Sequence, residues 1–188
     1  VYFGGIWGGQ LQWYKDNKLC FNESGAAAPP PADTQAIIPP KKSDCDALPS
    51  RVARLAPDMM HFAEDPKPII ILDKEGKPLK ADDPHRFFEA SWCHKYKGKY
   101  YFSYSTGDTH MICYAIGDNP YGPFTYQGVI LTPVKSGWTT HHSIVEFKGK
   151  WYLFHHDSAP SGGVNSLRSL KVAELHYNED GTIQTIEG

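Results

Sequence analysis

The chain has 188 residues, a formal net charge of -2 at pH 7 and an aromatic content of 13%. This length fits one domain with a sizeable core, and the near-neutral charge favours neither a nucleic-acid partner nor a membrane surface. The chain contains 17 Gly and 15 Pro, and so many turn formers beside so many aromatics predict an all-β protein with short strands. No apolar run reaches the length that spans a membrane.

The N-terminal residues 1–13 predict a strand, a Gly-rich turn and a second strand. Glycines let a backbone approach a ligand or another strand closely, and Trp7 lies within this turn. Its ring would either stack on the apolar face of a sugar or pack in the core. The chain begins in mid-strand at Val1, without a Met, so we expect it to be part of a longer polypeptide.

Residues 22–50 differ in composition from the rest of the chain. They contain Ala-Ala-Ala-Pro-Pro-Pro at 26–31 and a second Pro pair at 39–40. Proline disfavours both helix and strand, so we expect an extended surface loop inserted into the domain.

Short strands alternate with turn clusters along the rest of the chain. The predicted strands lie at 51–55, 69–72, 100–105, 111–116, 124–131, 144–147, 151–156, 167–177 and 182–186. The strand at 100–105 consists of aromatic and hydroxyl residues, which suits packing on both faces. Four cysteines are present but form no C-x-x-C pair, so we expect free thiols rather than a zinc site; they are Cys20, Cys45, Cys93 and Cys113.

A repeat organises the second half of the chain. Lys-Gly-Lys-Tyr-Tyr-Phe at 97–102 matches Lys-Gly-Lys-Trp-Tyr-Leu at 148–153, 51 residues further on. Each copy predicts a β-hairpin, and a repeat of this period built from short strands is typical of propeller blades. The two copies and their flanking pieces make about three blades. A closed ring has at least four, so part of the ring is expected to be absent.

Glu89 lies between Phe88 and Ala90, just before the first hairpin. A carboxyl group in apolar surroundings tends to hold its proton to higher pH, which suits a general acid. In the repeat, Glu89 aligns with Thr140, next to His141. The first strand of a propeller blade lines the central axis, so both residues are expected at one end of that axis. The alternative is a structural Glu, either facing solvent at a strand edge or buried.

Four segments resemble glycoside hydrolase family 43, the five-bladed β-propellers that include β-xylosidases and α-L-arabinofuranosidases. They are Arg-Phe-Phe-Glu-Ala-Ser-Trp at 86–92, Thr-Thr-His-His-Ser at 139–143, Leu-Arg-Ser-Leu-Lys-Val at 167–172 and Trp-Gly-Gly at 7–9. The resemblance covers nearly the whole chain apart from the Pro-rich loop. It implies that residues 1–188 are the C-terminal part of a propeller catalytic domain.

The resemblance implies an inverting glycosidase acting on xylan- or arabinoxylan-derived sugars. Glu89 would be the general acid, Arg168 would contact the sugar or the catalytic carboxylates, and Trp7 would lie near the sugar subsite. His141 resembles the axial His of the family, which lies near the substrate and helps to hold a hydrated Ca²⁺ on the propeller axis. Because Ca²⁺ prefers oxygen ligands, we expect His141 to meet the ion through water.

One part of the family pattern is not found. The general-base Asp and the Asp that orients the acid belong to the first two blades, which should precede the turn at Gly4. Only three residues precede Gly4, and Asp16, Asp82 and Asp83 fit neither role. We therefore expect two partners: a xylo-oligosaccharide or arabinosyl substrate, and a second chain or segment carrying the N-terminal blades.

Two other functions stay open on the sequence alone. A non-catalytic carbohydrate-binding propeller would explain the absent Asp residues, and a scaffold could bind partners through a polyproline II segment in the 22–50 loop. For single residues, His141 could be a satisfied turn histidine and Arg168 could form only a surface ion pair. The sequence does not separate xyloside from arabinofuranoside specificity.

Overall fold

The computed structural model describes residues 1–4, 13–15, 18–20, 46–80, 82–107, 109–137 and 140–188. Within these ranges the chain forms strands β1 to β13 and one short 3₁₀ helix, η1 (Ala159–Ser161), with no α-helix. The all-β prediction is confirmed. Nothing helical in the described part is long and apolar enough to cross a membrane.

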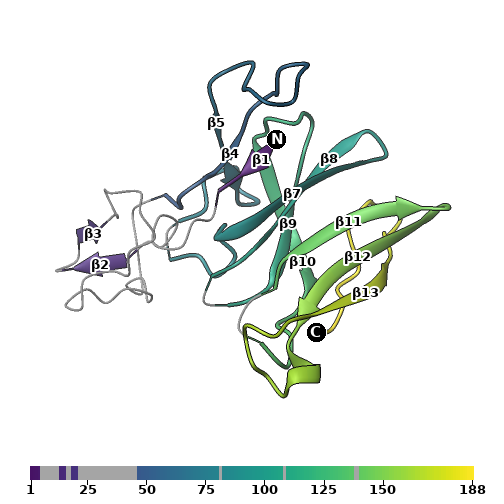
Figure 1. The fold of residues 1–188 in the computed structure, drawn as a ribbon. Coiled ribbons are helices and arrows are strands. Elements are labelled where there is room, and N and C mark those ends of the chain that lie inside the picture. The colour runs from purple at the N-terminus through teal and green to yellow at the C-terminus, as the bar shows by residue number, and fades with distance from the viewer. Residues whose placement is uncertain (5–12, 16–17, 21–45, 81, 108, 138–139) are drawn as a thin grey trace.

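Three sheets and one small hairpin make up the structure (Figure 1). The N-terminal sheet has the order β1 (Tyr2–Phe3), β4 (Ser50–Val52), β5 (Lys67–Ile69). The central sheet has the order β6 (Ile71–Leu72), β10 (Phe124–Leu131), β9 (Ile112–Gly117), β8 (Lys99–Ser105), β7 (Glu89–Tyr96). The C-terminal sheet has the order β11 (His142–Phe147), β12 (Lys150–Asp157), β13 (Ser169–Leu175). The hairpin pairs β2 (Trp13–Lys15) with β3 (Lys18–Cys20).

The central sheet lies between the other two (Figure 1). Its strand β7 contacts β1 of the N-terminal sheet and β11 of the C-terminal sheet. From β7 to β10 the strands are antiparallel neighbours in chain order, which is the connectivity of a meander. Because β7 is the edge strand that contacts both other sheets, residues at the starts of β7 and β11 can meet.

The repeat predicted from the sequence forms two matching hairpins, β7–β8 and β11–β12. The turn residues Lys97 and Gly98 have φ of 45° and 83°, and Lys148 and Gly149 have φ of 52° and 78°. Positive φ at both central residues is the type I′ geometry, which matches the twist of the flanking strands. The Lys-Gly-Lys sequences thus set the register of both hairpins.

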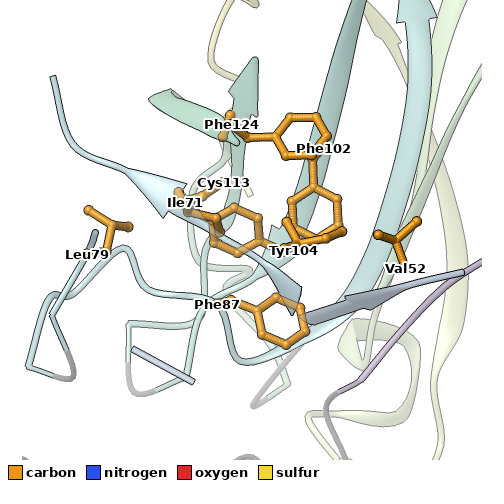
Figure 2. Packing of buried hydrophobic residues seen from close by; sticks show 10 residues of the cluster. Val52, Ile71, Leu79, Phe87, Phe102, Tyr104, Cys113 and Phe124 are labelled. Atoms are coloured by element: carbon orange, nitrogen blue, oxygen red, sulfur yellow. The ribbon is translucent and has the colours of Figure 1, made fainter. Parts of the chain in front are cut away.

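Two hydrophobic cores hold the three sheets together, one on each face of the central sheet. Figure 2 shows the first core, where Phe102 and Tyr104 of β8 meet Val52 from the N-terminal sheet and Phe87 from the connection before β7. The second core, against the C-terminal sheet, is formed by Tyr101, Ile112, Tyr114, Ile130, Leu131, Ile144, Leu153, Leu175 and Ile183. Strand β8 is buried on both faces, as its composition predicts.

Two predicted strands differ in the structure. The strand expected at 69–72 is divided, because β5 ends at Ile69 and β6 starts at Ile71. Ile70 is partly exposed, and its carbonyl accepts the Phe124 N–H at 3.0 Å; the chain leaves the N-terminal sheet here and joins the central one. Residues 182–186 form only isolated bridges, Tyr177 with Ile183 and Leu131 with Ile186.

Some predictions fall on residues that the structure does not describe. Trp7 and most of the 22–50 loop lie outside the described ranges, as does Cys45, and the side chain of Cys20 is likewise outside them. Cys93 and Cys113 are free thiols, as expected.

Candidate active site

A β-bulge sets the position of Glu89 at the start of β7. Glu89 pairs with Ser105 and the next pair is Trp92 with Ser103, so β7 holds one extra residue between them. Ala90 takes up the irregularity with φ of 60°, a conformation that costs a non-Gly residue about 1–2 kcal/mol. Because a bulge changes the direction of neighbouring side chains, it aims Glu89 differently from a regular strand residue.

A side-chain hydrogen bond beyond the bulge connects β7 to the C-terminal sheet. The Trp92 indole N–H donates to the Ile144 carbonyl of β11 at 3.1 Å. This bond ties β7 to β11 three residues from Glu89, so the starts of the two strands keep a defined separation.

Glu89 and His141 are brought together across these two sheets. Glu89 Oε1 lies 3.0 Å from His141 Nε2. The Glu89 side chain is 17% exposed and that of His141 is 48% exposed. A shielded carboxyl group is therefore bonded to an imidazole that solvent, or a ligand, can reach.

His156 holds the backbone of His141. The His141 amide donates to His156 Nε2 at 3.0 Å. Burial and, to a lesser extent, the nearby Arg168 charge lower the pKa of His156 to about 4. His156 is thus neutral at neutral pH, and the state with an unprotonated Nε2 is the one that can accept this bond.

Arg168 makes no direct hydrogen bond with Glu89 or His141 among the described residues; its side chain lies against His156. Its Nε donates to the Asn165 carbonyl at 3.0 Å, and its Nη1 lies 3.4 Å from His156 Nε2. In the described part of the chain, Arg168 forms no ion pair with a carboxylate. Two residues, His156 and His141, therefore separate Arg168 from Glu89 in the structure.

The sequence favours a packing or hydrogen-bonding role for His156, and the structure gives its ring a hydrogen bond from the His141 amide. Counting back from the two-residue turn at Lys148 and Gly149 places residue 156 opposite residue 141. The register of this hairpin therefore identifies His156 as the neighbour of His141.

A family model described as glycosyl hydrolases family 43 matches residues 50–183. The chain belongs to glycosyl hydrolase family 43. The matched range contains Glu89, His141, His156 and Arg168.

Several family 43 relatives are similar over the whole chain. It is 66% identical over 187 residues to a protein of Xylanibacter ruminicola described as a β-xylosidase, covering 100% of this chain and 54% of the relative. It is also 66% identical over 189 residues to a xylosidase/arabinosidase of Bacteroides ovatus, covering 100% of this chain and 53% of that protein. The chain thus spans about half the length of these relatives.

A solved family 43 structure has the same fold. It is a β-xylosidase/α-arabinofuranosidase from a compost microbial metagenome in complex with xylotriose, in a calcium-free form. The match has 55% identity and a TM-score of 0.81, and it covers 99% of this chain and 53% of the other. That description ties both calcium and a xylo-oligosaccharide to a relative of this chain.

Asp157, the carboxylate next to His156, is committed to other contacts. Its Oδ2 lies 2.5 Å from Lys171 Nζ, and its Oδ1 accepts the Ala159 N–H at 3.2 Å. The bond from Lys171 lowers the pKa of Asp157, and its side chain is almost completely buried. Lys171 and the backbone at the start of η1 therefore hold Asp157.

The described residues around His141 do not fit a direct calcium site. No group of three or more His, Cys, Asp or Glu side chains that could hold a metal ion occurs in the ranges that the structure describes. Imidazole nitrogen is a poor ligand for Ca²⁺, which takes six to eight oxygen ligands. Contact between His141 and calcium through water stays a prediction.

Proposed function

We propose that this chain is the acid-bearing part of an inverting family 43 glycosidase, with Glu89 as the general acid. The substrates would be xylan- or arabinoxylan-derived chains that end in β-xylosyl or α-L-arabinofuranosyl units. The observation that carries this proposal is the 3.0 Å contact between the shielded Glu89 carboxyl and the exposed His141 imidazole, in a chain of family 43. The relatives described as xylosidases and arabinosidases support the substrate class.

In the proposed reaction, Glu89 gives its proton to the glycosidic oxygen as the bond from that oxygen to the anomeric carbon breaks. A base on the opposite face of the sugar takes a proton from water, whose oxygen forms the new bond to the anomeric carbon. In inverting enzymes the two carboxyl groups stand about 6.5–9.5 Å apart, which leaves room for the water. The base and the Asp that orients the acid would come from outside the described residues.

We propose further that the complete domain is a five-bladed propeller, of which this chain supplies about three blades. The outer face of the C-terminal sheet supports this proposal, because large apolar side chains on it are exposed to solvent. Phe147 is 59% exposed, Leu170 is 76% exposed and Val172 is 58% exposed. Exposed apolar patches mark interaction surfaces, and the other sheets of this chain bury such side chains against each other. The segment or chain carrying the first blades would cover this face.

Calcium would lie on the axis of the completed ring, with water between the ion and His141. The calcium-free description of a relative supports the idea that calcium binds in this family. No step of the proposed reaction depends on the ion. Its binding would be measured as a rise in melting temperature on adding Ca²⁺ and its reversal by a chelator.

The test of the acid role uses this chain co-expressed with the part of the Xylanibacter ruminicola relative that it does not match. In that assembly, Glu89→Ala should lower kcat on xylobiose by about 100- to 10,000-fold. An activated aryl xyloside needs little protonation of its leaving group, so its cleavage should fall far less. Equal losses on both substrates would remove Glu89 from the acid role.

A non-catalytic carbohydrate-binding domain is the second candidate. It is favoured by the absence, in the described ranges, of an Asp that fits the base. Calorimetric titration of the chain with xylotriose would show binding, and analysis of the same mixture would show whether any xylose is released. Binding without release, in both the chain and the assembly, would favour this second candidate.

A further inference from the structure

Residues 140 and 141, just before β11, do not continue the regular hydrogen-bond ladder between β11 and β12. The pairs run from Phe147–Lys150 back to His142–His155, and the same register would place His141 opposite His156. In a hydrogen-bonded antiparallel pair, opposite residues exchange both of their backbone bonds. Here His156 makes both bonds with the side chain of Thr140 instead: its N–H donates to Oγ1 at 3.2 Å, and its carbonyl accepts from Oγ1 at 2.8 Å.

The Thr140 hydroxyl thus stands where the peptide group of His141 would be in a regular pair. A side-chain hydroxyl that competes with the backbone in this way interrupts a ladder. The His141 amide, released from the ladder, donates to the imidazole of His156 at 3.0 Å. This arrangement allows the His141 ring to reach Glu89 on the neighbouring sheet.

A hydrogen bond from β8, the strand that pairs with β7, also holds Thr140 in place. Its carbonyl accepts a hydrogen bond from Ser105 Oγ, and Ser105 is the residue that pairs with Glu89 in the β7–β8 ladder. Thr140 is 1% exposed, so water does not compete for these bonds and they are strong. One buried residue therefore connects the strand partner of Glu89 to β12.

We propose that Thr140 and His156 are positioning residues for the Glu89–His141 pair. Thr140 displaces His141 from the ladder, and His156 accepts the His141 amide proton and fixes the direction of its ring. Neither residue reacts with substrate. The catalytic consequence rests on the proposed function above, whereas the hydrogen-bond arrangement does not.

The kinetic test compares Thr140→Val, which keeps the shape and removes the hydroxyl, with Thr140→Ser, which keeps the hydroxyl. In the co-expressed assembly, Thr140→Val should lower kcat on xylobiose by about 10- to 100-fold, with a smaller loss on an activated aryl xyloside. Thr140→Ser should restore most of the activity. A variant that merely destabilised the fold would lower the activity on both substrates by the same factor.

His156 offers a second pair of variants. His156→Gln places an amide oxygen near the position of Nε2 and should keep most of the activity on xylobiose. His156→Phe keeps a ring but has no acceptor, so it should show the same substrate-dependent loss as Thr140→Val. Equal activity of the Gln and Phe variants would remove His156 from the positioning role.

A spectroscopic readout separates this proposal from the proposed function. In the ¹⁵N-labelled chain, the His141 amide and His156 Nε2 should show a scalar coupling through their hydrogen bond. We expect the coupling in wild type and Thr140→Ser and its loss in Thr140→Val. Persistence of the coupling in Thr140→Val would overturn the proposal. An assembly without turnover would contradict the proposed glycosidase function. The scalar coupling would still test the hydrogen-bond arrangement of Thr140, His141 and His156.

Discussion

The hairpins β7–β8 and β11–β12 are copies at their turns and differ at their opposite ends. Both turns are type I′, with Lys and Gly at positive φ. At the end near the site, the first hairpin has a backbone bulge at Ala90, whereas the second has the Thr140 hydroxyl in place of a backbone partner. Both irregularities lie beside the Glu89–His141 contact. The repeated turns therefore hold the fold, whereas the unlike ends bring Glu89 and His141 together.

The core positions that the two hairpins share should show the largest effects on stability. Phe102 and Leu153 occupy the same position in the two copies, and both are fully buried, in separate cores. Phe102→Ala should lower the free energy of unfolding by about 3–5 kcal/mol and Leu153→Ala by about 2–5 kcal/mol. Urea unfolding measures both losses. Val172→Ala, on an exposed position of β13, is the matched control and should cost under about 0.5 kcal/mol.

A second prediction concerns a position where the copies differ, His94 in β7 and Val145 in β11. Burial lowers the pKa of His94 to about 4. Its Nε2 lies 2.6 Å from the Tyr177 hydroxyl, and its Nδ1 is buried with no hydrogen-bond partner among the described residues.

Because the folded pKa of His94 lies below the unfolded value of about 6.5, the unfolded chain takes up the proton first as the pH falls. The contribution of His94 to stability is complete above about pH 6.5 and falls as the pH falls toward 4, by about 2 kcal/mol at pH 5. Unfolding measured from pH 7.5 to 4.5 should show this loss, with a shallower slope in His94→Gln. An unchanged slope in that variant would contradict the assignment to His94.

The turns should respond equally to the same change. Gly98 and Gly149 have no atom within 4 Å of an added Cβ, so the cost of Gly→Ala comes from positive φ alone. Each substitution should lower the free energy of unfolding by about 1–2 kcal/mol. Costs that differ by more than about 1 kcal/mol would show that the two hairpins are not equivalent at their turns.

The smallest expected effect tests the bulge. Ala90→Gly removes the strain of φ at 60° but makes the unfolded chain more flexible, so the net gain in stability should be about 0.5 kcal/mol. Ala90→Val should instead destabilise the chain by more than about 1 kcal/mol, because a β-branched residue fits this conformation poorly. A loss of stability in Ala90→Gly would mean that the bulge is not strained.

Local sequence patterns predict the regular parts of this molecule well. The Lys-Gly-Lys turns determine the hairpins, and the aromatic run at 100–105 explains why β8 is buried on both faces. The alignment of the two copies also brings Glu89 close to His141. Each of these features depends on neighbouring residues or on a simple repeat.

The irregular parts could not be predicted in the same way. Ala90 gives no signal for a bulge, because Ala rarely adopts positive φ. The role of Thr140 depends on the exact register of β11 against β12 and on Ser105 from another sheet. Ile70 looks like part of a continuous apolar strand, and only the change from one sheet to the next exposes it. These features follow from tertiary contacts rather than from local preference.

The most direct measurement is the turnover of xylobiose by this chain alone, by the unmatched part of the Xylanibacter ruminicola relative alone, and by the two co-expressed, with native mass spectrometry of each sample. We predict a one-to-one assembly that releases xylose, with no release by either part alone. A one-to-one assembly that binds xylotriose and releases no xylose would contradict the central claim that this chain supplies the acid of a glycosidase.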